Sequence, residues 1–225
     1  MNLNTLVQSI NEALEEKAHP DHREGMISYM KNQFEFYGVK SPNRKEVLRN
    51  IWKEHRSFIQ DNFRELTRHL WLCDHRECQY FAMDIIKKCK NQINGDDIAF
   101  LEHLITTKPW WDTVDFLSVH LGGQVFAKAP ELITPKTDAY LAGDNIWLIR
   151  LAIIYQLSYG PQTDKDRLFD ILVRSMGTKE FFINKAIGWA LRQYSKYNPN
   201  AVREFIETHK TEMANLSIRE GSKYI

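Results

Sequence analysis

Trp111 and Asp115 are spaced so that they could act together. The run that begins at Pro109 predicts a helix, because proline suits the first helical position. Residues four apart share a helix face, so the Trp111 ring and the Asp115 carboxylate are expected side by side, next to a core stripe. That stripe is formed by Trp110, Val114, Leu117 and Leu121. A carboxylate placed there could stabilise a positive charge that develops during a reaction.

The two aspartates of this helix have different simplest explanations. Asp112 falls in the first turn, where a carboxylate complements the helix dipole. Asp115 lies too deep in the helix for that role. It is either a carboxylate that points into a groove, or a solvated surface residue or lysine partner.

Trp189 stands in a row of cations. Counting along its predicted helix, one face carries Lys185, Trp189, Arg192 and Lys196, and the buried stripe consists of Ile183, Ile187, Ala190 and Tyr194. Such a face could hold phosphates with its cations and stack a sugar or base on its ring. The alternative is a half-buried ring covered by the alkyl stems of lysine and arginine.

Two further sites could hold an anion. Arg150 is the only charged residue between Asn145 and Thr163, so its guanidinium needs either a bound phosphate or a carboxylate of the next helical repeat. A helix start carries a serine and two cations, and this combination suits a phosphate, although many ordinary capped helices look the same. These residues are Ser41, Arg44 and Lys45.

The elements that position these residues are predicted to be helices throughout. Apolar residues follow helical spacing, and the alternation typical of strands is missing. Similar runs recur around Ala82, Asp115, Ala152 and Ala186, at spacings of 33, 37 and 34 residues. This period is typical of stacked antiparallel helix pairs. We therefore expect an all-α solenoid of HEAT-like repeats, forming a single domain over residues 1–225 with a concave basic groove.

The charge of the chain is small in total and uneven along its length. The 225 residues include 30 Lys and Arg against 29 Asp and Glu, a formal net charge of +1. Up to Asp144 there are 18 basic and 21 acidic residues, and after it 12 and 8, so the two parts carry −3 and +4. The total argues against a generally basic nucleic-acid protein, but the cations are concentrated.

Several other classes of protein fit the sequence poorly. Three cysteines are too few for a disulfide framework, and no apolar run approaches the roughly 18 residues of a membrane span. A possible zinc set does not have the usual paired spacing; it consists of His69, Cys73, His75 and Cys78. Glycine-rich phosphate loops and dinucleotide fingerprints are missing. We expect a cytoplasmic monomer without metal, cofactor or membrane contact.

Six segments of the chain, taken in order, resemble the AlkD-like DNA alkylation repair family, a group of HEAT-like repeat DNA glycosylases. They are residues 29–32, 41–44, 107–115, 144–150, 179–189 and 216–220. The most specific segments are residues 107–115 and 179–189, and weaker similarity extends over nearly the whole chain. The resemblance implies hydrolysis of the N-glycosidic bond of cationic alkylated purines in DNA, such as 3-methyladenine and 7-methylguanine. It also implies catalytic roles for Trp111, Asp115 and Trp189, and DNA contacts by Arg150 and Tyr29.

The residues fit this chemistry independently of the resemblance. Alkylation makes the purine a cationic leaving group, and the transition state places positive charge on the deoxyribose, which Asp115 could stabilise while orienting water. A lysine nucleophile is not required, so we expect a monofunctional hydrolase whose partner is double-stranded DNA containing alkylated purines. The DNA-binding residues are expected to be Arg150, Ser41, Arg44, Lys45, Lys185 and Arg192, and the resemblance adds Tyr29. The alternative is a non-catalytic helical-repeat protein that binds damaged DNA or protein partners.

Overall fold

The computed structural model describes residues 2–225, and its regular structure is helical. Within these residues the β-structure is limited to one isolated bridge, between Glu35 and His75. The prediction of an all-α helical-repeat fold is therefore confirmed. Contacts divide the chain into two compact units, of which the first ends at Gln92 and the second comprises Ile93–Ile225. That the whole chain behaves as one domain stays a prediction.

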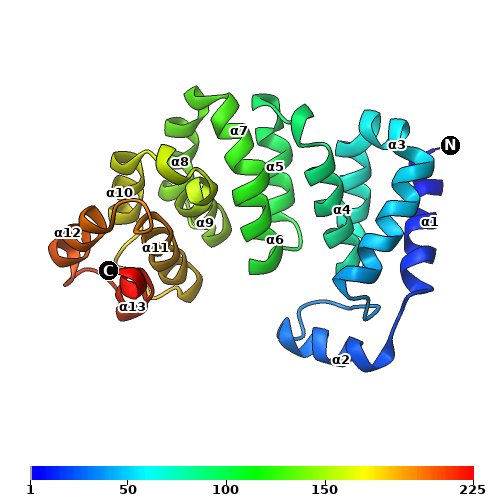
Figure 1. Cartoon of the computed structure of the whole chain (residues 1–225), viewed down its shortest axis with the longest axis horizontal. Helices are drawn as coiled ribbons and strands as arrows, with labels where there is room; N and C mark the ends of the chain where they lie inside the picture. Colours follow the sequence, from blue (N-terminus) through cyan, green and yellow to red (C-terminus); the bar gives the residue numbers. More distant parts are fainter. Residues whose placement is uncertain (1) are drawn as a thin grey trace. The chain divides into compact units, whose positions relative to one another are not determined.

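The first unit is built around α3, a helical segment that is interrupted by kinks (Figure 1). Its helices are α1 (Leu3–Glu15), α2 (Pro20–Tyr29), α3 (Ser41–Leu72) and α4 (Arg76–Lys88). Both α1 and α4 pack against α3, whose backbone leaves helical geometry at His55 and Asn62. The buried Glu77 carboxylate accepts the backbone N–H groups of Gly38 and Val39, each at 2.9 Å. Glu77 thereby ties the segment before α3 to α4.

The second unit is a series of helix pairs that follow one another in chain order from α5 to α13 (Figure 1). Its helices are α5 (Ile98–Thr106), α6 (Trp111–Phe116), α7 (Gly123–Lys128), α8 (Ile133–Ala142), α9 (Ile146–Ile154), α10 (Lys165–Arg174), α11 (Phe181–Tyr194), α12 (Pro199–His209) and α13 (Asn215–Gly221). A π-helical turn, Leu117–Gly122, joins α6 to α7 without a break, so these two count as one helix of the first pair. The opening helices of the four pairs begin at Ile98, Ile133, Lys165 and Pro199, so the pairs recur at nearly even intervals.

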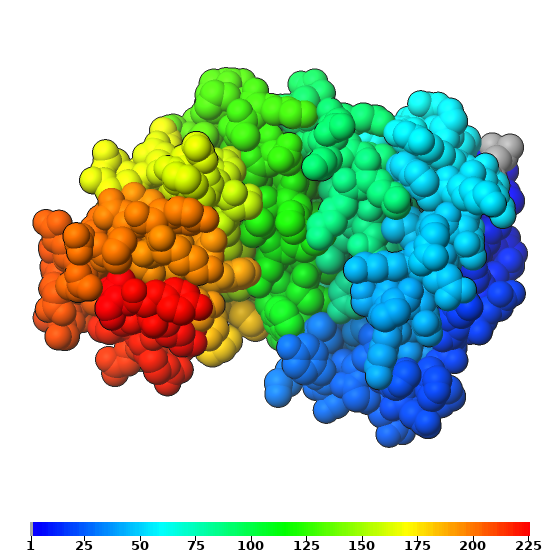
Figure 2. All heavy atoms as spheres, viewed as in Figure 1, coloured from blue at the N-terminus to red at the C-terminus, as the bar shows by residue number. Residues whose placement is uncertain are grey.

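The second helices of these pairs pack against one another in series. Helix α9 packs against α6 on one side and α11 on the other. Two of the residues that mark the sequence repeat, Ala152 and Ala186, are buried alanines on such helices, and Asp115 holds the corresponding place on α6. The remaining one, Ala82, is a buried alanine on α4 of the first unit. Drawn as spheres, the side chains of this unit fill the spaces between its ribbons (Figure 2). The HEAT-like name and a basic concave groove stay predictions.

The helix that carries Asp115 begins later than the sequence suggested. The predicted start at Pro109 is wrong, since α6 begins at Trp111 and Trp110 is extended with φ −159° and ψ 161°. In this conformation the Trp110 ring packs on Trp147 and Phe182, with ring centroids 5.9 and 5.3 Å away. Trp110 is half-buried, and the packing of its ring outweighs the preference of proline for the first helical turn. The rest of the predicted core stripe, Val114, Leu117 and Leu121, is fully buried as expected.

None of the helices in the described part of the chain is both long enough and apolar enough to cross a membrane.

Candidate active site

An open hollow in the second unit brings Asp115 and Trp189 together. We call it the site hollow; its volume is about 380 Å³, and its lining consists of Asp115, Phe116, Val119, His120, Leu157, Trp189 and Gln193. These residues come from α6 and its π-helical continuation, from the turn after α9, and from α11. Two of the three predicted catalytic residues therefore meet in one place, although they are far apart in the sequence.

Trp111, the third predicted catalytic residue, is the first residue of α6. It is half-buried and lies one helical turn before Asp115, so the helix places both on one face. Trp111 is outside the residues that line the site hollow. Helix α6 thus places the Asp115 carboxylate at the hollow and carries the Trp111 ring at the N-terminal end of the helix.

Arg150 on α9 forms a bidentate ion pair with Asp115. Its Nε donates to Asp115 Oδ1 at 2.6 Å and its Nη2 to Oδ2 at 2.9 Å. Only 4% of the arginine side chain and 18% of the aspartate side chain are exposed. The remaining terminal nitrogen, Nη1, donates to the backbone carbonyl of Phe182 at the start of α11. The predicted need for an anion at Arg150 is met by a carboxylate, which belongs to the preceding helix pair. A DNA contact by Arg150 stays a prediction.

Burial and the ion pair change the pKa of Asp115 in opposite directions. Burial raises the pKa of the carboxyl above its ordinary value, while hydrogen bonding to Arg150 and its positive charge lower it. Asp115 lines the site hollow and Arg150 does not, so the negative end of the pair faces the hollow. Both carboxylate oxygens keep a further lone pair, because an ionised carboxylate can accept about four hydrogen bonds.

An aromatic cluster supports the ion pair. The rings of Trp110, Trp147 and Phe182 lie in mutual contact, with centroid distances between 4.9 and 5.9 Å. Asn145 fixes the start of α9, because its side-chain oxygen accepts the backbone N–H groups of Trp147 and Leu148 at 3.0 and 3.3 Å. Packing around Phe182 therefore holds the carbonyl that Arg150 contacts.

The cations beside Trp189 are engaged within the protein. Lys185 and Arg192 contact the Glu220 carboxylate at 2.9 and 2.7 Å, and Lys223 contacts it at 2.9 Å. Hydrogen bonds from Lys223 and Lys185 lower the pKa of Glu220 to about 2. The expected buried stripe of α11, formed by Ile183, Ile187, Ala190 and Tyr194, is confirmed. Phosphate binding by Lys185 and Arg192 stays a prediction.

The other predicted DNA contacts belong to the first unit. Tyr29 ends α2 and is 66% exposed. Ser41 is the first residue of α3 rather than its cap, because the carbonyl of Lys40 accepts the first helical hydrogen bond and the serine side chain caps nothing. Lys45 borders an open hollow of about 310 Å³ whose other residues are Leu48, Arg49, Asp84 and Lys88.

Arg44 is engaged by a carboxylate within the chain. Its Nε donates to Asp84 at 3.0 Å, and both side chains are mostly buried. The guanidinium also lies over the Tyr80 ring, 5.2 Å from its centroid. Arg44 therefore supports the joint between α3 and α4, whereas Lys45 borders open space.

Several residues of the site hollow were missing from the sequence-based set. Phe116 and His120 form a ring pair at 4.8 Å, and Gln193 follows Trp189 by one turn of α11. Extending the faces of Asp115 and Trp189 by one turn would have found Val119 and Gln193. Phe116 and His120 follow Asp115 by one and five residues, so α-helical spacing does not place them beside it. Leu157 lies in the short turn Tyr155–Ser158, and no spacing rule points to it.

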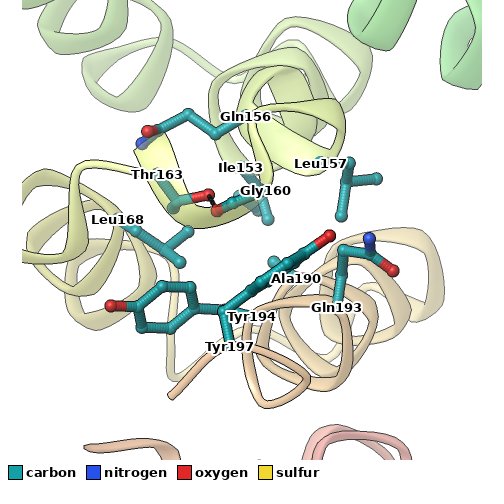
Figure 3. Close-up of a pocket in the computed structure, with 10 residues that line it drawn as sticks. All are labelled: Ile153, Gln156, Leu157, Gly160, Thr163, Leu168, Ala190, Gln193, Tyr194 and Tyr197. Atoms are coloured by element: carbon teal, nitrogen blue, oxygen red, sulfur yellow. Dashed lines mark hydrogen bonds between the residues drawn. The ribbon is translucent and has the colours of Figure 1, made fainter.

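A second, smaller pocket borders the site hollow (Figure 3). Leu157 and Gln193 line both, so they form the shared border. Tyr197 lies at the Gly160 turn, where φ is +60° and an added Cβ would come within 3.3 Å of the tyrosine hydroxyl. The left-handed backbone conformation favours glycine here, and any larger residue would also press on the tyrosine ring.

The cysteines of the candidate zinc set in the first unit have hydrogen-bond partners of another kind. In residues 2–225 no three side chains of the metal-binding types are placed to share an ion. The Cys78 thiol instead donates to Asn11 Oδ1 at 3.1 Å, and Asn11 Nδ2 donates to Cys73 Sγ at 3.5 Å.

Two comparisons with known proteins found matches that extend over most of the chain. The model of the DNA alkylation repair enzyme family matches residues 10–225. A solved structure titled "Predicted DNA alkylation repair enzyme from Enterococcus faecalis" is similar, with 30% sequence identity and a TM-score of 0.83 over 93% of this chain and 97% of that chain. Among curated proteins, none matches. The chain belongs to the DNA alkylation repair enzyme family.

Proposed function

We propose that this protein is a monofunctional DNA glycosylase that hydrolyses the N-glycosidic bond of cationic alkylated purines, such as 3-methyladenine and 7-methylguanine, in double-stranded DNA. The observation that carries the proposal is the meeting of Asp115 and Trp189 in one open hollow, with Arg150 behind the carboxylate. Membership in a DNA repair family supports DNA as the substrate.

The site suits a reaction in which positive charge moves to the sugar. An alkylated purine leaves as a neutral base, so strong protonation of the leaving group is unnecessary. The sugar becomes cationic in the transition state, and the Asp115 carboxylate offers a fixed negative charge to it. The same carboxylate keeps lone pairs free to orient an attacking water, as carboxylates do in glycoside hydrolysis. Trp189 adds a π-face for the cationic sugar.

The lining of the site hollow supports direct hydrolysis. Among its described residues there is no lysine that could form a covalent imine with the sugar. Water would then be the nucleophile, and the products would be the free base and an abasic site. DNA contacts by Tyr29, Ser41, Arg44, Lys45, Arg150, Lys185 and Arg192 remain part of the proposal. Of these, Lys45 has the clearest support because it borders open space with Arg49 and Lys88.

A base-release assay tests the proposed function. Duplex DNA containing 7-methylguanine should lose the modified base in the presence of the protein, and the strand should then break on alkaline treatment of the abasic site. Undamaged duplex is the control, and borohydride should trap no covalent complex. Binding to methylated DNA without release of the base would favour the non-catalytic alternative.

Replacing Trp189 by leucine should slow base release by about 2- to 30-fold, which corresponds to the roughly 0.5 to 2 kcal/mol of a cation–π contact. Single-turnover rates at saturating protein concentration isolate the chemical step from DNA binding. Trp52→Leu is the matched control, because Trp52 is also half-buried and has Lys88 over its ring at 4.7 Å, but belongs to the first unit. Equal rates for the wild type and Trp189→Leu would remove Trp189 from the site.

A further inference from the structure

Glu220 near the end of α13 is a buried carboxylate surrounded by cations. It is 4% exposed, and its two oxygens contact Lys185, Arg192 and Lys223 at 2.7 to 2.9 Å. Lys185 and Arg192 belong to α11, whereas Lys223 lies in the turn after α13. Charge-assisted hydrogen bonds of this kind are shorter and stronger than neutral ones. The cluster therefore joins α13 firmly to α11.

The two α11 cations stand on either side of Trp189. Lys185 precedes it by four residues and Arg192 follows it by three, so all three lie on one helix face. Glu220 thus binds the helix one turn before and one turn after the tryptophan. This fixes the part of α11 that presents Trp189 to the site hollow.

Backbone packing brings α13 to the same place. A Cβ added to Gly188 would lie 2.5 Å from Glu220 Cβ and 2.9 Å from the carbonyl oxygen of Ser217. Only glycine allows this approach, and Gly188 immediately precedes Trp189. The Ser217 hydroxyl also donates to the carbonyl of Asn184 at 2.8 Å. The two helices are therefore in close contact next to the tryptophan.

Trp189 depends on this support because its own ring has few constraints. Within the described chain no hydrogen bond, ring stacking or cation contact of the Trp189 indole is present, and the side chain is half-buried at the hollow. Its position is accordingly set by the place and rotation of α11.

We propose that Glu220 is a positioning residue, which holds Trp189 at the site hollow by binding Lys185 and Arg192 on both sides of it. The inference rests on the proposed function for its catalytic consequence, but the placement of Trp189 can be measured without activity. Glu220 also neutralises part of the charge of Lys185 and Arg192. Glu220→Gln is therefore expected to leave DNA affinity unchanged or increase it while it slows base release.

Fluorine NMR of protein labelled with 5-fluorotryptophan tests the placement directly. The chain has 6 tryptophans, and the signal of Trp189 is identified by its loss in Trp189→Phe. Glu220→Gln should shift or broaden the Trp189 signal and leave the signals of Trp52 and Trp71 in place. Ser217→Ala is the matched control, since it removes a hydrogen bond of the same helix contact without touching the cations. If Glu220→Gln does not fold, Arg192→Met is used instead, because it removes one of the contacts between α11 and Glu220.

Base release provides a second readout through a double-mutant cycle. If Glu220 acts through Trp189, Glu220→Gln alone should slow single turnover by no more than Trp189→Leu does, and the double variant should stay within about 2-fold of Trp189→Leu. Ser217→Ala combined with Trp189→Leu should show independent effects.

Three results would overturn the inference: an unchanged Trp189 signal in Glu220→Gln, an equal change in Ser217→Ala, or rate losses that multiply in the double variant. A wild-type protein that releases no base would contradict the proposed function, and the NMR result would still decide whether Glu220 places Trp189.

Discussion

Asp115→Asn should reduce the release of 7-methylguanine by at least about 100-fold while the affinity for duplex DNA stays within a few-fold. Loss of one preorganised electrostatic group from a site typically costs about 100- to 1,000-fold in rate. The amide keeps the size of the side chain but removes the negative charge that faces the site hollow. Single-turnover base release and equilibrium DNA binding separate the two quantities.

The control for this experiment is Asp138→Asn. Asp138 also pairs with an arginine, Arg174, at 2.6 Å, but 49% of the aspartate side chain and 39% of the arginine side chain are exposed. Its replacement should therefore leave base release unchanged. Thermal unfolding of both variants shows whether each is folded at the assay temperature, which matters because the amide at position 115 leaves Arg150 without its counter-ion. Full activity of a folded Asp115→Asn protein would refute the catalytic role of the carboxylate.

Arg150→Met should have the largest effect on stability, about 3 to 5 kcal/mol, because it leaves one member of a buried ion pair without its partner. Denaturant unfolding measures this loss. Arg174→Met is the control, since it breaks surface pairs with Asp138 and Asp170, which are worth about 0 to 1 kcal/mol. Equal losses of unfolding free energy for the two variants would show that the Arg150 pair stabilises the fold no more than a surface pair does.

The pH dependence of Arg150→Met should run in opposite directions for activity and stability. Burial already raises the pKa of Asp115, and without Arg150 nothing opposes that rise. Base release needs the ionised carboxylate, so its acid limb should move to higher pH and the rate should rise with pH. Because the folded-state pKa then lies above the unfolded one, the contribution of this group to stability is present at low pH and is lost as pH rises through the folded-state pKa. An acid limb at the wild-type position would contradict this account.

Features that depend on one helix were readable from the sequence. The buried stripes around Val114 and Ile187 were predicted correctly, because a residue's face follows from its spacing along a helix. The recurrence of Ala82, Ala152 and Ala186 reflects a real packing position, where a small side chain lets neighbouring helices approach. The requirement that Arg150 find an anion also followed from its apolar surroundings.

Features that depend on pairing between helices were not readable. The sequence placed Lys185 and Arg192 on a cationic face, but only the fold brings Glu220 against them. The same holds for Arg44 and Asp84, which lie on different helices. The start of α6 was misplaced because tertiary packing of the Trp110 ring decides it, and this contact involves residues of two later helices. Local spacing contains no information on such contacts.

The contacts of Arg150 make the site carboxylate depend on the state of α11. The Arg150 guanidinium contacts Asp115 on α6 and the Phe182 carbonyl on α11, so it joins three successive helix pairs through one side chain. Folding of a repeat protein can begin at any repeat and spread to its neighbours, and Arg150 has its full set of acceptors only when all three pairs are docked. Local opening of α11 would remove one of these acceptors, and would loosen the hold on the carboxylate before the rest of the unit unfolds.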